Sequence, residues 1–351
     1  MKKSLFITII IALLASCVFA QEFKPYGSAR IGYWYDMQSK EMTGNKADLD
    51  LNYGLQSNSR FGVNFTKDNL QAKVEYGAKV DGTSTVNLRL LYAKYAFNDM
   101  SLLIGQDYDG TNEYASQVYG DDANLIGFGA VDGGRNPQIK AEFKNGLYFS
   151  LIKPAFTASS GFGADSSDVL IPRINIGYKF NHENIYIHPS FVLQQTSYSK
   201  DDNSDLSDDV STLAYLFAVT GQMKMDAITL RAQANYGSNT GNMGYKGPGN
   251  KAKWMAADQE FSNTSTLGGF AEASYALSKE LVFNTGFGYA SSSNDEWDED
   301  DAQASMYVQA KIKIQSLQLI PEIGIQDKMK NNAGVKEGNK TYFGTQLRMD
   351  F

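Results

Sequence analysis

Cysteine, histidine and long apolar runs are scarce in this 351-residue sequence. Cys17 is the only cysteine, and the chain holds two histidines and seven prolines. A single cysteine cannot form an intrachain disulfide, and two histidines leave few candidates for a catalytic base. After the N-terminal stretch, no segment approaches the roughly 20 apolar residues that a membrane-spanning helix needs. Any insertion of this chain into a membrane would therefore use another kind of structure.

The N-terminus has the pattern of a secretory signal peptide. Two lysines precede an apolar run over residues 5–14, and small residues lead up to Ala20, which is the order of charge, apolar core and cleavage site. We expect cleavage after Ala20, so that 1–20 is the leader and 21–351 is a single mature domain. A lipoprotein leader is an alternative, because small residues also precede Cys17.

The charge balance of the chain is acidic. Its formal net charge is −7, and loss of the two leader lysines lowers this to −9. A nucleic-acid footprint would be basic, so nucleic acid is not an expected partner. With 42% hydrophobic residues, 13% aromatic residues and 32 glycines, the composition suits β-sheet rather than a disordered chain.

Apolar and polar residues alternate along most of the chain. Over 173–180, isoleucines and aromatic residues alternate with Arg, Asn, Gly and Lys, and 304–314 repeats the pattern. Runs of about ten such residues closed by polar turns are typical of a transmembrane β-barrel. The pattern predicts an all-β fold, an antiparallel barrel of about 16 strands, near 23–37, 48–65, 70–81, 85–97, 100–108, 137–144, 147–154, 170–180, 184–197, 211–224, 227–238, 264–277, 280–290, 302–314, 317–327 and 339–351.

The connections between these runs alternate in length. Every second one is a turn of two to four residues, such as Asn145-Gly146, which favours a tight hairpin, and the others are longer and polar. Transmembrane barrels combine short periplasmic turns with long extracellular loops in this way. A soluble two-sheet β-sandwich is the alternative for alternating strands. Lysines and arginines at strand centres favour the barrel, whose polar face meets water.

Two stretches of the sequence resemble the general bacterial porins. Residues 57–106 hold a Ser-Arg-x-Gly strand, a short turn, an alternating strand, an Arg-x-x-Tyr strand and a strand ending in glycine, as the early strands of that family do. The closing TYFGTQLRMDF is similar to the family's last strand. By that resemblance Leu347, Met349 and Phe351 would carry the signal read by the barrel assembly machinery. The resemblance further implies sixteen strands and a homotrimer.

The resemblance to porins also implies a constriction loop. The third long connection, 109–136, is the longest in the chain and would fold into the lumen. Fixed charges of opposite sign on facing walls would then sort solutes by charge and dipole. The implied selectivity residues are inward arginines on the strands and acids on this loop: Arg30, Arg60, Arg89, Asp109, Glu113, Asp121 and Asp122.

The function that follows is a passive, water-filled diffusion channel in the outer membrane. Its partners would be outer-membrane lipid, lipopolysaccharide and small hydrophilic solutes, with no cofactor and no catalysis. No serine motif accompanies His182 or His188, so an outer-membrane enzyme has little support. The sign of any ion preference stays open at this stage.

Three alternatives remain. A solute-selective channel for sugars or anions would use an inward aromatic path, and a barrel without conductance would act as an adhesin or envelope anchor. The acidic stretches 201–209 and 295–301 could bind divalent cations, but the calcium-loop spacing is incomplete and no metal site is predicted. The candidate aromatic path comprises Trp34, Tyr148, Tyr186, Tyr307 and Tyr342.

Overall fold

The computed structural model describes residues 22–78, 86–155, 157, 171–201 and 206–351. The expected leader, its cleavage point and Cys17 lie outside these residues. None of the helices in the described part of the chain is long and apolar enough to cross a membrane.

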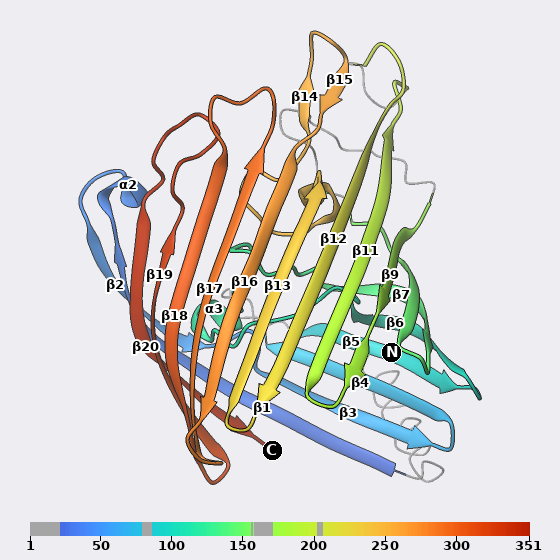
Figure 1. Ribbon diagram of the computed structural model, residues 1–351, viewed down its shortest axis with the longest axis vertical. Coiled ribbons are helices and arrows are strands. Elements are labelled where there is room, and N and C mark those ends of the chain that lie inside the picture. Colours follow the sequence, from blue (N-terminus) through green and yellow to red (C-terminus); the bar gives the residue numbers. More distant parts are fainter. Residues whose placement is uncertain (1–21, 79–85, 156, 158–170, 202–205) are drawn as a thin grey trace, which may run out of the picture.

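Sixteen antiparallel strands form one closed barrel (Figure 1). Two of them are interrupted, so the main sheet has eighteen labelled segments. Each predicted strand is present, with bounds that differ by a few residues. The segments are β1 (Glu22–Gln38), β2 (Asp48–Leu55), β3 (Arg60–Lys67), β4 (Leu70–Ala78), β5 (Val86–Ala96), β6 (Met100–Tyr108), β7 (Arg135–Phe143), β8 (Leu147–Ile152), β9 (Arg173–Tyr178), β10 (Phe180–His182), β11 (Ile185–Tyr198), β12 (Val210–Met225), β13 (Ile228–Ser238), β16 (Ser265–Ala276), β17 (Leu281–Ser293), β18 (Asp301–Ile314), β19 (Leu317–Asp327) and β20 (Asn339–Asp350).

The first and last strands close the barrel. Along β1 and β20, Ile31 pairs with Leu347, and the backbones of Gly27 and Phe351 exchange hydrogen bonds of 2.7 and 3.0 Å. Closure removes the free sheet edge, so the backbone groups at this seam are satisfied without water. The C-terminal residues expected to carry the assembly signal therefore form part of the barrel seam.

Apolar side chains cover the outside of the barrel and polar ones its inside. Phe61 on β3, Ile139 on β7 and Phe287 on β17 are 54%, 49% and 51% exposed. On the same strands the alternate residues Gln138 and Asn284 are buried. An apolar outer face around a polar lumen suits lipid outside and water inside. The β-sandwich alternative is wrong, because one closed sheet replaces two packed ones.

Two irregularities in the wall matter for the site. The second strand is broken between β2 and β3, where residues 56–59 leave the ladder. Between β4 and β5 the register shifts: Glu75 pairs with Leu90 and Tyr76 pairs with Leu88, which leaves Arg89 as the extra residue of a bulge. The bulge shifts the alternation of inward and outward side chains along β5, since bulges re-aim side chains.

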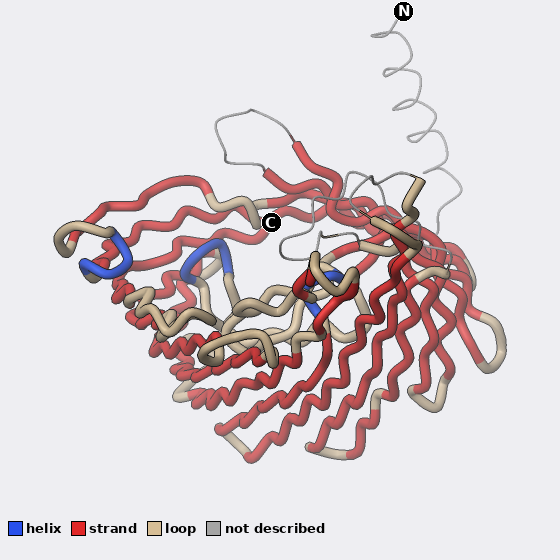
Figure 2. The backbone as a smooth tube through the Cα atoms, turned by 90° about the horizontal axis from the view of Figure 1, so that it is seen from above, coloured by secondary structure: helices blue, strands red, loops and turns tan. Residues whose placement is uncertain are grey.

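The loops contain structure that alternation could not predict. A four-residue helix, α2 (Lys40–Thr43), lies between β1 and β2, and α3 (Tyr119–Asp122) lies between β6 and β7. Between β13 and β16 there is a short 3-10 helix, η2 (Thr240–Met243), and a hairpin of β14 (Lys253–Met255) and β15 (Glu260–Ser262). Seen from above, loop segments lie inside the ring of strands (Figure 2).

Candidate functional site: a charged constriction in the lumen

The connection between β6 and β7, here called L3 (residues 109–134), lies against the inner wall of the barrel. It ends two residues before the predicted limit, because β7 begins at Arg135. Inward side chains hydrogen-bond its backbone: Glu322 accepts from the N–H of Val118 at 2.8 Å, and Gln309 donates to the carbonyl of Ser116 at 2.6 Å. Further along L3, similar bonds come from Asn235, Gln233 and Gln303.

Aromatic packing also fixes L3 to the wall. The rings of Tyr119 and Tyr342 stack with centroids 3.7 Å apart, and Trp34 meets Tyr119 edge-on at 5.4 Å. Tyr307 is 1% exposed and its hydroxyl accepts from the N–H of Ser116 at 3.0 Å. These aromatic side chains pack beneath L3 instead of lining open space. A continuous aromatic path for sugars therefore has no support in this geometry.

The start of L3 is tied to the wall by two of the predicted acids. Asp109 Oδ2 lies 3.0 Å from Arg173 Nη2, with neither side chain exposed. Asp109 Oδ1 also accepts from Asn175 at 2.5 Å. Glu113 Oε1 accepts from the Tyr186 hydroxyl at 2.6 Å and lies 3.1 Å from Nδ1 of His188. Asp109 and Glu113 thus hold the loop.

The electrostatics of Glu113 agree with this anchoring position. Burial raises the pKa of Glu113, but hydrogen bonds from His188 and Tyr186 outweigh that effect, so its pKa lies below the ordinary glutamate value. On its other side His188 meets the hydroxyl of Tyr148, 3.1 Å from Nε2. Of the predicted aromatic residues, Tyr186 therefore bonds Glu113 directly, and Tyr148 bonds the histidine that contacts Glu113.

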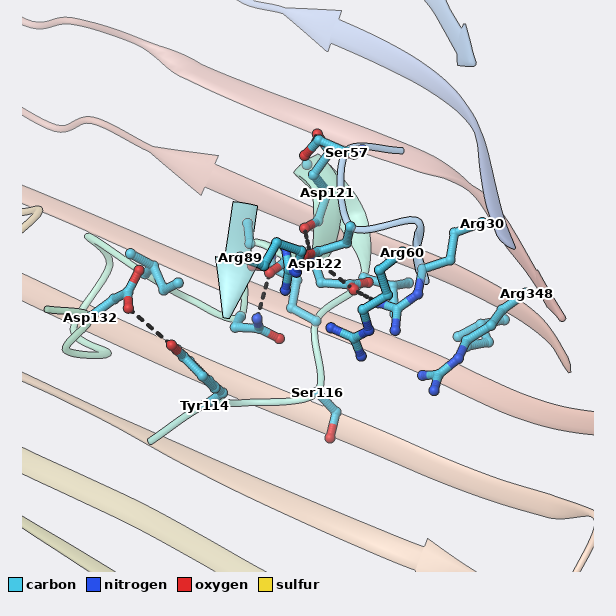
Figure 3. A pocket seen from close by; sticks show the side chains of 18 of the residues that line it. Arg30, Ser57, Arg60, Arg89, Tyr114, Ser116, Asp121, Asp122, Asp132 and Arg348 are labelled. Atoms are coloured by element: carbon cyan, nitrogen blue, oxygen red, sulfur yellow. Dashed lines mark hydrogen bonds and ion pairs between the residues drawn. The ribbon is translucent and has the colours of Figure 1, made fainter. Parts of the chain in front are cut away.

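The tip of L3 carries the other two predicted acids and docks at the broken strand (Figure 3). Asp122 forms an ion pair with Arg30 of β1, whose side chain is 4% exposed. The carboxylate of Asp121 accepts from the N–H of Ser57 at 3.0 Å and from its hydroxyl at 2.8 Å. Asn58 donates to Asp122 Oδ2 at 3.1 Å. The interruption of the second strand is thus the place where the loop tip binds.

Arg89 and Arg60 lie on the wall that faces this tip. Arg89 Nε donates to Glu75 at 2.7 Å, and its other nitrogens reach Asn58 at 3.0 Å and Tyr108 at 3.1 Å. Arg60 Nε is 3.8 Å from Glu75. One buried carboxylate therefore sets the position of two arginines, and the bulge at Arg89 aims its guanidinium along the wall.

A cavity of about 680 Å³ remains between L3 and this wall. Arg30, Arg60, Arg89, Asp121 and Asp122 line it together, whereas Asp109 and Glu113 do not. Its charged lining comprises seven cations and three acids, which are Arg30, Arg60, Arg89, Arg135, Lys246, Lys311 and Arg348 against Asp121, Asp122 and Asp132.

Four of these cations were not among the predicted site residues. Lys311 and Arg348 follow the strand alternation and could have been found from the polar face of their strands. Arg135 is the first residue of β7, and Lys246 belongs to a loop, so periodicity gives no signal for either. Among the acids, Asp132 accepts from the hydroxyl of Tyr114 at 2.9 Å.

The two acidic outer stretches are described only in part. Within the described residues, no group of three or more histidine, cysteine or acidic side chains is placed to hold a metal ion. Lys330 pairs with Glu299 at 2.8 Å, and Lys200 lies 3.7 Å from Asp208. Part of the first acidic stretch, 202–205, lies outside the described residues.

Comparison with known proteins finds similar folds among solved structures but no relative by sequence. No protein-family model matches the chain, and no curated protein matches it. The outer membrane channel DcaP of Acinetobacter baumannii is 16% identical over 94% of this chain and 97% of its own, with a TM-score of 0.73. An anion-selective porin from Comamonas acidovorans is 13% identical over 94% and 99%, with a TM-score of 0.61. A Salmonella typhi OmpF complex with daunomycin is 12% identical over 94% and 97%, with a TM-score of 0.60.

Proposed function

This chain has the fold of the outer-membrane porins, and we propose that it forms a water-filled channel for passive diffusion of small hydrophilic solutes and ions. The observation that carries the proposal is the polar cavity of about 680 Å³ inside a barrel with an apolar outer face. Such a barrel spans the outer membrane with strands and leaves its lumen to water. Export would use the leader 1–20.

The lining charges favour anions as the preferred ions. Seven cations face three acids, and Asp122 is already paired with Arg30. The pair of Asp122 with Arg30 removes one charge of each sign, and Glu75 balances one of the two arginines that it contacts, Arg60 and Arg89. Cations remain in excess along the lining. A narrow passage lined by one dominant sign raises the local concentration of the opposite ion. We therefore propose that the channel conducts anions in preference to cations.

The test is single-channel conductance of the folded mature protein in a planar bilayer, with a salt gradient for the reversal potential. We expect large, steady steps and a reversal potential of the sign that marks anion preference. A conducting channel with cation preference would overturn the selectivity alone. A folded, inserted barrel without conductance would overturn the channel and leave the adhesin or anchor alternative.

We also propose that the barrel assembles as a homotrimer. On β2, Leu49, Leu51, Tyr53 and Leu55 are between 46% and 69% exposed, which gives a second copy a large apolar surface to cover. One structural neighbour, OmpT of Vibrio cholerae, has been solved in a trimer form. Conductance steps in multiples of three, together with a cross-linked trimer in membranes, would support this assembly. A protein that stays monomeric after treatment with the cross-linker would contradict it.

The other proposed partners are those that a barrel in the outer membrane would meet. Outer-membrane lipid and lipopolysaccharide would contact the apolar outer face, and the assembly machinery would read the last strand. Phe351 is 75% exposed, and Met349 and Leu347 are 47% and 41% exposed on the same face. Replacing Phe351 by serine would therefore slow insertion into the membrane in cells, measured by the fraction of heat-modifiable, folded barrel.

A further inference from the structure

A second segment of the chain, residues 239–252 between β13 and β14, folds inward beside L3. All four residues of η2 within it are buried, and Tyr245 is 4% exposed. In Figure 1 the segment follows the upper end of β13. A connection in the wet outer region would expose its side chains, so this burial marks it as part of the lumen's packing.

The 239–252 segment is braced by its own polar side chains. Asn250 donates to the hydroxyl of Thr240 and to the carbonyl of Tyr245, both at 3.0 Å. Asn242 accepts from the N–H of Ala252 at 2.9 Å. These bonds close the segment on itself and satisfy its backbone. The segment therefore has a defined shape of its own.

The 239–252 segment also locks onto L3. The Tyr245 hydroxyl lies 3.1 Å from Thr111 Oγ1 and 3.2 Å from Asp109 Oδ2. Met243 and Tyr245 share a buried apolar cluster with Val131 of L3. A small cavity of about 20 Å³ lies between the two loops and the barrel wall. Together they fill one side of the lumen and confine the open passage to the other.

Lys246 projects from this rigid segment into the open cavity. It is exposed, whereas the preceding Tyr245 is buried, and it lines the main cavity. A Cβ added at Gly127 of L3 would lie 3.6 Å from Lys246 Cβ, so the lysine stands on the loop side of the passage. No ion pair joins Lys246 to any residue in the described ranges.

The position of Lys246 differs from that of the other lining cations. Within the described lining, the other six lie on strands, and L3 supplies the three acids. A cation on the loop side breaks this division, because an anion drawn to the wall arginines then meets positive charge on both sides. The braced backbone fixes the point from which the lysine side chain enters the passage.

We propose that residues 239–252 form a second constriction element and that Lys246 is a specificity-determining residue for anionic solutes. The inference rests on the proposed channel function and deepens it. Lys246 adds an unpaired charge where the loop side would otherwise present only carboxylates. Removing or reversing this charge should then change selectivity with little change in pore size.

The first test compares Lys246→Glu with Lys253→Glu. Lys253 lies in β14, donates to the carbonyl of Glu296 at 3.0 Å and does not line the cavity. Lys253→Glu therefore makes the same change in charge outside the passage. We expect Lys246→Glu to lower the anion-to-cation permeability ratio by about twofold or more, and Lys253→Glu to leave it near wild type. Equal shifts in both variants, or no shift in Lys246→Glu, would overturn the proposal.

A second test changes the charge after folding. The described residues contain no cysteine, so Lys246→Cys gives a single target for small thiol reagents added to the open channel. A positively charged reagent should restore the wild-type permeability ratio, and a negatively charged one should lower it further. Modification that leaves the ratio unchanged would refute the role of this position. Wild-type conductance in the same bilayers separates failure of this inference from failure of the channel itself.

Discussion

Arg173 of β9 and Asp109 of L3 form an ion pair that solvent does not reach. The two atoms that join them are 3.0 Å apart, and both side chains are 0% exposed. Arg173 Nη1 also donates to the carbonyl of Met243 at 2.9 Å. One guanidinium on the barrel wall thus contacts both L3 and the 239–252 segment.

Replacing Arg173 by methionine should therefore loosen both loops at once. Loss of one partner leaves Asp109 buried without a counter-charge, which costs about 3–5 kcal/mol. We expect a lower unfolding temperature in detergent and noisier open-channel current. Adding Asp109→Asn to the same chain removes the uncompensated charge and should recover part of the stability. A double variant as unstable as Arg173→Met alone would contradict this account.

Gly288 on β17 sets how closely L3 approaches the wall. A Cβ at this position would collide with the carbonyl oxygen of Phe128 in L3. Gly288→Leu should push L3 into the passage, at an overpacking cost of about 1–3 kcal/mol, and lower the single-channel conductance. Gly221→Leu is the control, because an added Cβ there meets nothing within 4 Å. Equal conductance in the two variants would argue against contact between L3 and β17.

Lys311 tests the anion preference from the strand side. It lines the cavity, and Lys313, two residues along the same face of β18, does not. Lys311→Glu should shift the reversal potential toward cations, by a several-fold fall in the anion-to-cation permeability ratio, because it reverses a charge at the passage. Lys313→Glu should shift it less. A larger effect at Lys313 would place the selective region nearer the periplasmic end.

Glu113 gives a prediction on pH. Its pKa lies below the ordinary value of 4.5 because His188 and Tyr186 bond its charged form. A lowered pKa contributes stability above the unfolded value and loses it as the pH falls through the lower folded value. The unfolding temperature of wild type should therefore exceed that of Glu113→Gln from neutral pH down to 4.5, and the difference should shrink in stronger acid.

The control for that experiment is Glu299→Gln, in which an exposed acid paired with Lys330 loses its charge. Exposed pairs contribute little, about 0–1 kcal/mol, so its difference from wild type should be small at every pH. A difference for Glu113→Gln that vanishes already near neutral pH would refute the depressed pKa.

Strand periodicity predicted the barrel well and the loops poorly. Alternation over residues such as 304–314 fixes which side chain faces lipid, because the period of two is set by backbone geometry. It placed Arg30 and Arg60 inward correctly. It could not show that Asp109 turns to Arg173, since a loop has no period and its partners lie far away in the chain. For the same reason Lys246 carried no sequence signal.

Arg89 shows that sequence alternation does not fix every side-chain direction even within a strand. Its inward direction could be proposed from the resemblance to other barrels, but the bulge that aims it depends on pairing with Glu75 and Tyr76 across β4. Register is a property of two strands, so one run of residues does not reveal it.

The break between Leu55 and Arg60 makes L3 a part of the barrel wall. The N–H of Ser57, in a wall otherwise satisfied by neighbouring strands, donates to Asp121 at 3.0 Å. Ser57 lines the cavity, so without the docked tip of L3 this donor would need water as its acceptor. The tip of L3 therefore supplies a hydrogen-bond acceptor that the interrupted strand lacks, and the completed wall contains the loop as one of its parts.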